Sequence, residues 1–177
     1  MREAAAYLIS EALGWGLVPP TVLREGPHGL GSVQFFIHAQ EGMHFFTIQD
    51  DLAYTDELKR LAAFDVIANN ADRKSGHCLV DHQGQLWAID NALTFHEEPK
   101  LRTVIWDFAG QPLPEEVSGD LYDLQNALVE SASLSRALGG LLSAAEMAAL
   151  RRRLRRLVQS GRFPEPGPGR HVPWPLV

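Results

Sequence analysis

The stretch FDVIANNADRKSGHCLVDHQGQLWAIDNALTF, residues 64–95, decides how this chain is interpreted. It starts inside a predicted helix over about 52–69, where apolar residues recur at helical spacing: Leu58, Leu61, Ala62 and Val66. The polar segment 69–77 that follows is poor in helix signals and predicts a loop. The segment CLVDHQGQLWAID, 78–90, predicts a β-hairpin that turns near Gly84 and ends on an acid.

Several side chains in this stretch are of the types that phosphoryl transfer requires. That reaction needs a carboxylate to orient the attacking hydroxyl, ligands for a divalent metal, and a cation for the developing charge. Asp72 opens the loop, His77 follows five residues later, and Asp90 closes the hairpin. Kinase catalytic loops place an acid, a metal ligand and a second metal-binding acid in this order. Arg73, beside Asp72, could orient that carboxylate or contact a phosphate.

The motifs N-A-D-R-K-S-G-H and A-I-D-N-A-L-T-F resemble those of a bacterial branch of the phosphatidylinositol 3-/4-kinase-like superfamily. The resemblance extends to REAAAYLISEALGWGLVPPTVLREG, to SVQFFI as the hinge strand and to EPKLRTVIWDFAG, so that it covers residues 2–110. It implies an α+β, protein-kinase-like fold with a mainly helical C-lobe and an incomplete, β-containing N-lobe. It also implies a kinase-type phosphotransferase that uses ATP and Mg²⁺ or Mn²⁺.

Carried over residue by residue, the resemblance gives Asp72 the role of catalytic acid and makes His77 and Asp90 the metal ligands. Glu3 would be the helix acid that pairs with an ATP-binding lysine. Four hinge residues would line the adenine pocket: Gln34, Phe35, Phe36 and Ile37. The implied acceptor is a hydroxyl of a protein, a small molecule or a lipid.

Three features depart from the family's pattern and keep other functions open. His77 stands where Asn is usual, Asn91-Ala92 follows Asp90 where a residue pair ending in Gly is expected, and no glycine-rich phosphate loop or lysine strand precedes the helix of Glu3. We therefore expect an N-terminally truncated lobe. The alternatives are a pseudokinase-like module that binds a nucleotide or partner, and an inactive remnant whose exposed hinge edge pairs with a second copy.

The predicted organisation has three parts: a partial N-lobe and hinge over 1–50, a helical catalytic lobe over 51–160, and a Pro/Gly-rich tail over 161–177. Helices are expected at 2–13, 114–130 and 143–160, the last with a Ser143–Glu146 capping box. Strands are expected at 21–25, 32–38 and 43–48. Four aromatic residues in these strands are expected in the core: Phe35, Phe36, Phe45 and Phe46.

Composition excludes several classes of function. A formal net charge of −6 disfavours non-specific nucleic-acid binding, and a single cysteine, Cys78, excludes an internal disulfide and zinc sites with several cysteines. We expect a cytoplasmic protein without membrane insertion, because the start does not resemble a signal peptide and no apolar run is long enough to cross a bilayer. No H-E-x-x-H or G-x-S-x-G motif supports a hydrolase.

Each candidate residue also has a purely structural interpretation. Asp72 and Arg73 could form a surface ion pair, and His77 could bond to backbone in a tight turn. Asp90 could cap the segment that follows it, and Glu3 could be a solvated acid in the first turn of a helix. The run RRRLRR at 151–156 is expected to form the solvated face of a helix.

Overall fold

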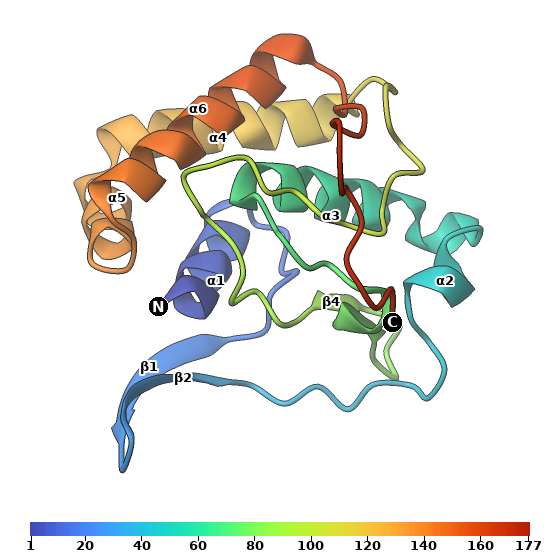
Figure 1. Ribbon diagram of the computed structural model, residues 1–177, viewed down its shortest axis with the longest axis horizontal. Helices are drawn as coiled ribbons and strands as arrows, with labels where there is room; N and C mark the ends of the chain where they lie inside the picture. The colour runs from blue at the N-terminus through green and yellow to red at the C-terminus, as the bar shows by residue number, and fades with distance from the viewer.

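The computed structural model describes residues 1–177 as an α+β arrangement of six α-helices and two separate two-stranded antiparallel sheets. Figure 1 shows α4 and α6 side by side above the central helix α3, with α1 below them and the sheets at the opposite end. None of the helices combines the length and the apolar character needed to cross a membrane. The helices are α1 (Arg2–Ala12), α2 (Phe45–Ile48), α3 (Thr55–Ala68), α4 (Glu115–Glu130), α5 (Ala132–Gly139) and α6 (Ala144–Ser160), with 3-10 turns at Leu52–Tyr54 and Ser75–His77.

The helix ends follow from local sequence signals. The Asp51 side chain accepts a hydrogen bond from the Ala53 N–H and so starts the turn that leads into α3. In α6 the Ser143 side chain accepts from the Glu146 N–H while the Glu146 carboxylate accepts from the Ser143 N–H, as the capping box predicted. Gly161 ends that helix in a left-handed conformation, with φ of 59°.

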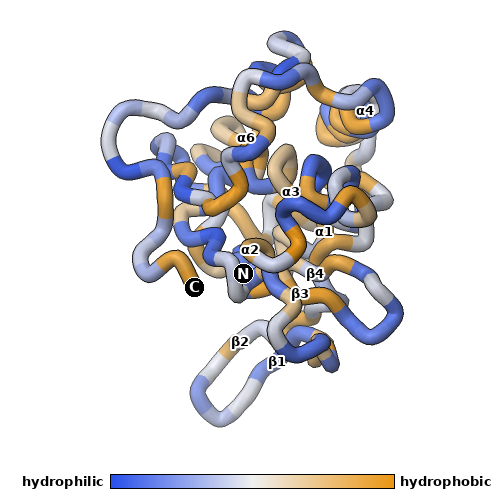
Figure 2. Tube along the Cα trace, turned by 90° about the vertical axis from the view of Figure 1, so that its right-hand side faces the viewer, coloured by the Kyte–Doolittle hydropathy of each residue, from blue (hydrophilic) through white to orange (hydrophobic).

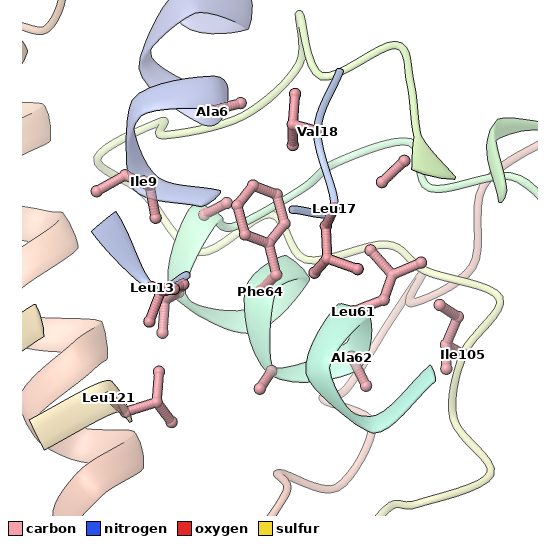
Figure 3. Packing of buried hydrophobic residues seen from close by; sticks show 14 of the residues in the cluster. Ala6, Ile9, Leu13, Leu17, Val18, Leu61, Ala62, Phe64, Ile105 and Leu121 are labelled. Carbon is pink, nitrogen blue, oxygen red and sulfur yellow. The ribbon is translucent and has the colours of Figure 1, made fainter. Parts of the chain in front are cut away.

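One hydrophobic core joins the first helix to the helical body. Figure 3 shows Phe64 of α3 among Ile9, Leu13 and Leu17, and all four side chains are buried. Buried apolar residues of α4 and α6 continue the same core up to Phe163. The segments 1–50 and 51–160 therefore share one core and do not bury separate ones.

The two sheets differ in position. The strands β1 (Thr21–Gly26) and β2 (Gly29–Gln34) form a hairpin that extends away from the body, as Figures 1 and 2 show. The strands β3 (Cys78–Val80) and β4 (Leu86–Ala88) form the predicted hairpin and pack against the core. The C-terminal tail has no regular element, as predicted, and runs back along the body toward the β3–β4 hairpin (Figure 1).

The prediction of strands over 32–38 and 43–48 is wrong in part. The Phe35 N–H still donates to the Pro20 carbonyl, but Pro20 has no N–H to donate in return, and β2 ends at Gln34. Phe35 and Phe36 are 65% and 73% exposed and are not core residues.

The segment expected as a third strand is instead the short helix α2. The Thr47 hydroxyl accepts from the His44 N–H and the Thr47 N–H donates to the His44 carbonyl, and these bonds start the helix. Its helical turn buries Phe45 and leaves Phe46 37% exposed, so only one of these two aromatic residues is in the core.

Candidate functional site

The loop that follows α3 is held in place by two asparagines. Asn69 ends α3 in a left-handed conformation, and its side-chain amide donates to the carbonyls of His96 and Glu98. The Asn70 side-chain oxygen accepts from the Asp72 N–H at 2.9 Å. Both asparagines therefore stabilise the loop, which agrees with the usual role of this residue type in turns.

Arg73 is completely buried and does not contact Asp72. Its Nε donates to both carboxylate oxygens of Asp65 at 3.1 Å, and its two terminal nitrogens donate to the Ile89 carbonyl and the Asn91 side chain at 2.8 and 2.7 Å. The predicted roles of orienting Asp72 or contacting a phosphate do not fit a side chain with no exposed surface. Because Ile89 and Asn91 flank Asp90, Arg73 instead links the loop to the end of the β3–β4 hairpin.

The buried side chains of Arg73 and Asp65 are of opposite charge type. Burial is the largest influence on the pKa of Arg73 and lowers it, but the Asp65 charge and hydrogen bond, with smaller contributions from other groups, together raise this pKa, so the guanidinium stays charged. Burial raises the pKa of Asp65, and the Arg73 charge and the hydrogen bonds to Asp65 offset only part of that rise. Thr103 and Asn70 also donate to the Asp65 carboxylate, at 3.2 Å each. A buried ion pair with this many hydrogen bonds is the arrangement that offsets the cost of removing both charges from water.

Asp72, His77 and Asp90 lie on the solvent side of this network. His77 Nε2 is 3.4 Å from Asp90 Oδ2, and Lys74 Nζ is 3.4 Å from Asp72 Oδ2. The Asp90 side chain is 55% exposed, and its backbone is left-handed with φ of 54°. Asp is among the non-glycine residues that adopt this conformation most readily, and Asn69 and Phe95 of this chain share it.

The imidazole of His77 is neutral at pH 7. Burial lowers the pKa of His77 below its ordinary value of 6.5, and the nearby Asp90 carboxylate offsets only part of this effect. His77 Nδ1 is buried and has no hydrogen-bond partner, so the ring does not bond to backbone through this atom. A neutral imidazole keeps the lone pair that a metal requires.

Glu3 is a half-buried acid and not the solvated one that was considered. Burial raises its pKa and repulsion from the Asp90 carboxylate raises it further, while hydrogen bonding to Asn91 and the Arg73 charge offset part of this rise. Its Oε2 atom is buried without a hydrogen-bond partner. A cation beside the Glu3 and Asp90 carboxylates would offset both the burial of the Glu3 charge and its repulsion from Asp90.

The side chains of this site supply only part of the coordination that a divalent metal needs. No three His, Cys, Asp or Glu side chains are grouped closely enough to form a metal site by themselves. His77 and Asp90 could supply two ligands, and Mg²⁺ and Mn²⁺ sites in phosphotransferases commonly complete their coordination with phosphate oxygens and water. An imidazole ligand favours Mn²⁺ over Mg²⁺.

The four predicted hinge residues do not come together as an adenine pocket. Gln34 donates through its side-chain amide to the Thr21 hydroxyl, and Ile37 is buried. Phe35 and Phe36 extend into solvent, and other residues of the chain cover little of their surface. The structure therefore offers an open strip at this position and not an enclosed site.

A contact without any local sequence signal fixes the middle of the loop. Ser75 is buried, its N–H donates to the Leu176 carbonyl at 2.8 Å, and its hydroxyl accepts from the Phe46 N–H at 3.1 Å. The same hydroxyl lies 2.9 Å from His44 Nδ1. The tail and α2 thus hold the backbone midway between Asp72 and His77.

Comparison with known proteins identifies the family to which this chain belongs. No family model matches it. Protein Rv2133c of Mycobacterium tuberculosis (strain ATCC 25618 / H37Rv) is 36% identical over 208 residues, an alignment that covers 98% of this chain and 74% of the relative. The two sequences therefore align along almost the whole of this chain, and the chain belongs to the same family as Protein Rv2133c.

Proposed function

We propose that this chain is a kinase-type phosphotransferase, or the catalytic lobe of one, that uses ATP and a divalent metal. The observation that carries the proposal is the 3.4 Å approach of His77 Nε2 to Asp90 Oδ2, two side chains that flank the open end of the β3–β4 hairpin. The Asp72 carboxylate acts to raise the pKa of His77, and the Asp90 carboxylate raises the pKa of Glu3. The resemblance of residues 2–110 to the phosphatidylinositol 3-/4-kinase-like superfamily gives the same assignment.

In the proposed reaction each side chain has a separate task. His77 and Asp90 hold the metal, which would offset the charge of the phosphate oxygens. Asp72 accepts a hydrogen bond from the acceptor hydroxyl and so orients it. Lys74, whose ammonium lies beside Asp72 and is 21% exposed, supplies the mobile cation that the buried Arg73 cannot supply.

The acceptor is a hydroxyl of a protein, a small molecule or a lipid, and we favour the first two. We also propose a cytoplasmic location, because the one cysteine, Cys78, is free and buried, as suits a reducing compartment. Burial raises the pKa of the Cys78 thiol to about 12, so this residue is inert and has no place in the reaction.

A second candidate function is a pseudokinase-like binding module. It is favoured by the exposure of Phe35 and Phe36, since an adenine ring would find no enclosed site there. It is also favoured by Asn91, which stands next to Asp90 and is committed to Arg73. Such a module would bind ATP weakly or not at all.

A calorimetric titration of ATP, with Mn²⁺ and then Mg²⁺, tests the proposal. We expect metal-dependent binding to wild type and to Asp72→Asn, which keeps the metal ligands but should lose transfer. Asp90→Ala should bind at least about tenfold more weakly, because loss of even an outer-shell partner of a metal costs about 10–100-fold.

The matched control is Asp123→Ala, which removes an exposed carboxylate from α4. It should bind ATP as wild type does. Equal weakening in both alanine variants would show a general charge effect and contradict the Asp90 assignment. A folded wild type that binds no ATP at millimolar concentration would overturn the kinase proposal in favour of the binding module.

A further inference from the structure

The β1–β2 hairpin is a two-stranded sheet that the rest of the chain leaves uncovered beyond its base, where Thr21 is buried. Every β2 residue from Gly29 to Val33 is exposed, and Gln34 is half-buried. The apolar side chains of this region expose a large share of their surface: Val22 60%, Leu30 59%, Val33 48%, Phe35 65% and Phe36 73%. Isolated two-stranded hairpins are marginally stable in water, so a partner strand would stabilise this one.

The outer edge of β2 carries unpaired backbone groups. The Phe35 N–H donates to the Pro20 carbonyl, and the register pairs Val22 with Val33, so these pairs exchange the hydrogen bonds inside the hairpin. The alternate residues Leu30, Ser32 and Gln34 therefore direct their N–H and C=O groups away from β1. No backbone hydrogen bond from elsewhere in the chain reaches these three residues.

We propose that β2 pairs with β2 of a second copy of this chain, antiparallel and about a two-fold axis at Ser32. Leu30 of one copy then lies opposite Gln34 of the other, and the outward N–H and C=O groups of both edges are satisfied. The result is a continuous four-stranded antiparallel sheet. The pairing is independent of the reaction that the candidate site performs.

The side chains of β2 are complementary to themselves in this register. Val33 of one copy lies opposite Gly31 of the other, and Phe35 lies opposite Gly29. The space beside both glycines is open, because a Cβ built on either one has no atom within 4 Å. A large side chain facing a glycine across a sheet shields its exposed backbone, a known stabilising device in designed sheets.

Charge and size determine how strong the pairing is. The β2 sequence GLGSVQ has no charged residue, so no like charges meet at the two-fold axis. Six residues on each side are fewer than the 20–30 that a standard stable interface uses. We therefore expect a dimer that dissociates at micromolar concentrations and not a permanent one.

Sedimentation velocity over a range of protein concentration tests the pairing. The wild-type mass should rise from one chain toward two as concentration increases. Ser32→Pro removes an outward N–H without touching the β1–β2 hydrogen bonds and should stay monomeric. Glu25→Pro is the matched control, because its N–H points outward at the β1 edge, and it should dimerise as wild type does.

A disulfide experiment decides the question if a proline variant fails to fold. Residues of a hydrogen-bonded antiparallel pair have Cα atoms about 5.5 Å apart, within the range that a disulfide spans. Since Cys78 is buried, Ser32→Cys supplies the only exposed thiol and should give a covalent dimer on mild oxidation. A wild type that is monomeric at all concentrations, or equal cross-linking by Ser32→Cys and Glu25→Cys, would overturn the proposal.

Discussion

The two hairpins of this protein have the same pairing geometry and opposite surroundings. The β3–β4 hairpin has three residue pairs and packs on the core, whereas the β1–β2 hairpin has six pairs and extends into solvent. The Asp81 carboxylate holds the β3–β4 turn by accepting from the N–H groups of Gln83 and Gln85 and from the Trp87 indole. The β3–β4 hairpin has fewer strand pairs, but burial and side-chain contacts make it a rigid support. The β1–β2 hairpin lacks these contacts, and its outer edge stays free for the proposed pairing.

The largest difference between the two hairpins should come from the buried ion pair that anchors β3–β4. Asp65→Asn leaves the charge of Arg73 uncompensated in the interior and should lower the free energy of unfolding by about 3–5 kcal/mol. Urea denaturation measures this loss. Asp123→Asn, on the exposed surface of α4, should change it by less than about 0.5 kcal/mol. A loss below about 1 kcal/mol for Asp65→Asn would mean that the Arg73 network does not anchor the hairpin.

A matched pair of leucines compares the hairpins directly. Leu86 of β4 is 2% exposed and Leu30 of β2 is 59% exposed. Leu86→Ala should cost about 2–5 kcal/mol, because it leaves a cavity in the core. Leu30→Ala, measured below the concentration at which the chain dimerises, should cost less than about 0.5 kcal/mol. Equal costs would show that the β1–β2 hairpin is covered by something within a single chain.

The smallest expected effect is a pH dependence at the β3–β4 turn. The Trp87 indole and the backbone N–H groups of Gln83 and Gln85 hold the pKa of Asp81 below its ordinary value of 3.8. A carboxyl group with a lowered pKa adds stability that is complete above pH 3.8 and is lost as pH falls through the folded-state pKa. Asp81→Asn should therefore be less stable than wild type at pH 7, and the difference should shrink as pH falls below 3.8. A difference that does not change with pH would contradict the role of the charge.

Local signals in the sequence account for most of the predicted elements. The helix caps, the apolar spacing of α3 and the glycine turn of β3–β4 are all decided by neighbouring residues, and they occur as expected. The strand predicted over 32–38 ends early because strand continuation depends on a partner: Pro20 supplies no N–H, and its effect falls on Phe35, 15 positions later. The strand predicted over 43–48 is a helix because His44 and Thr47 form the contacts that start one.

The order of the candidate site residues along the chain could be predicted from the sequence, but the contacts that hold them in place could not. Asp72, His77 and Asp90 were identified from their spacing, and His77 and Asp90 do meet, while their chemical roles stay predictions. Asp65 stands among the apolar residues of a helix, a signal that could have indicated a buried acid, but Arg73 was not predicted to be its partner. The contact of Ser75 with Leu176 joins segments 101 residues apart and has no local signal.

The position of the chain's two ends has a practical consequence for preparing the protein. The Asp90 carboxylate raises the pKa of Glu3, and the Leu176 carbonyl accepts the Ser75 N–H, so segments near both ends interact with the candidate site or with the loop that carries it. A polyhistidine purification tag fused at either end would bring additional metal-binding imidazoles within a few residues of His77. Titrations with Mn²⁺ then measure the tag together with the protein, and only material from which the tag has been cleaved can report the affinity of the site itself.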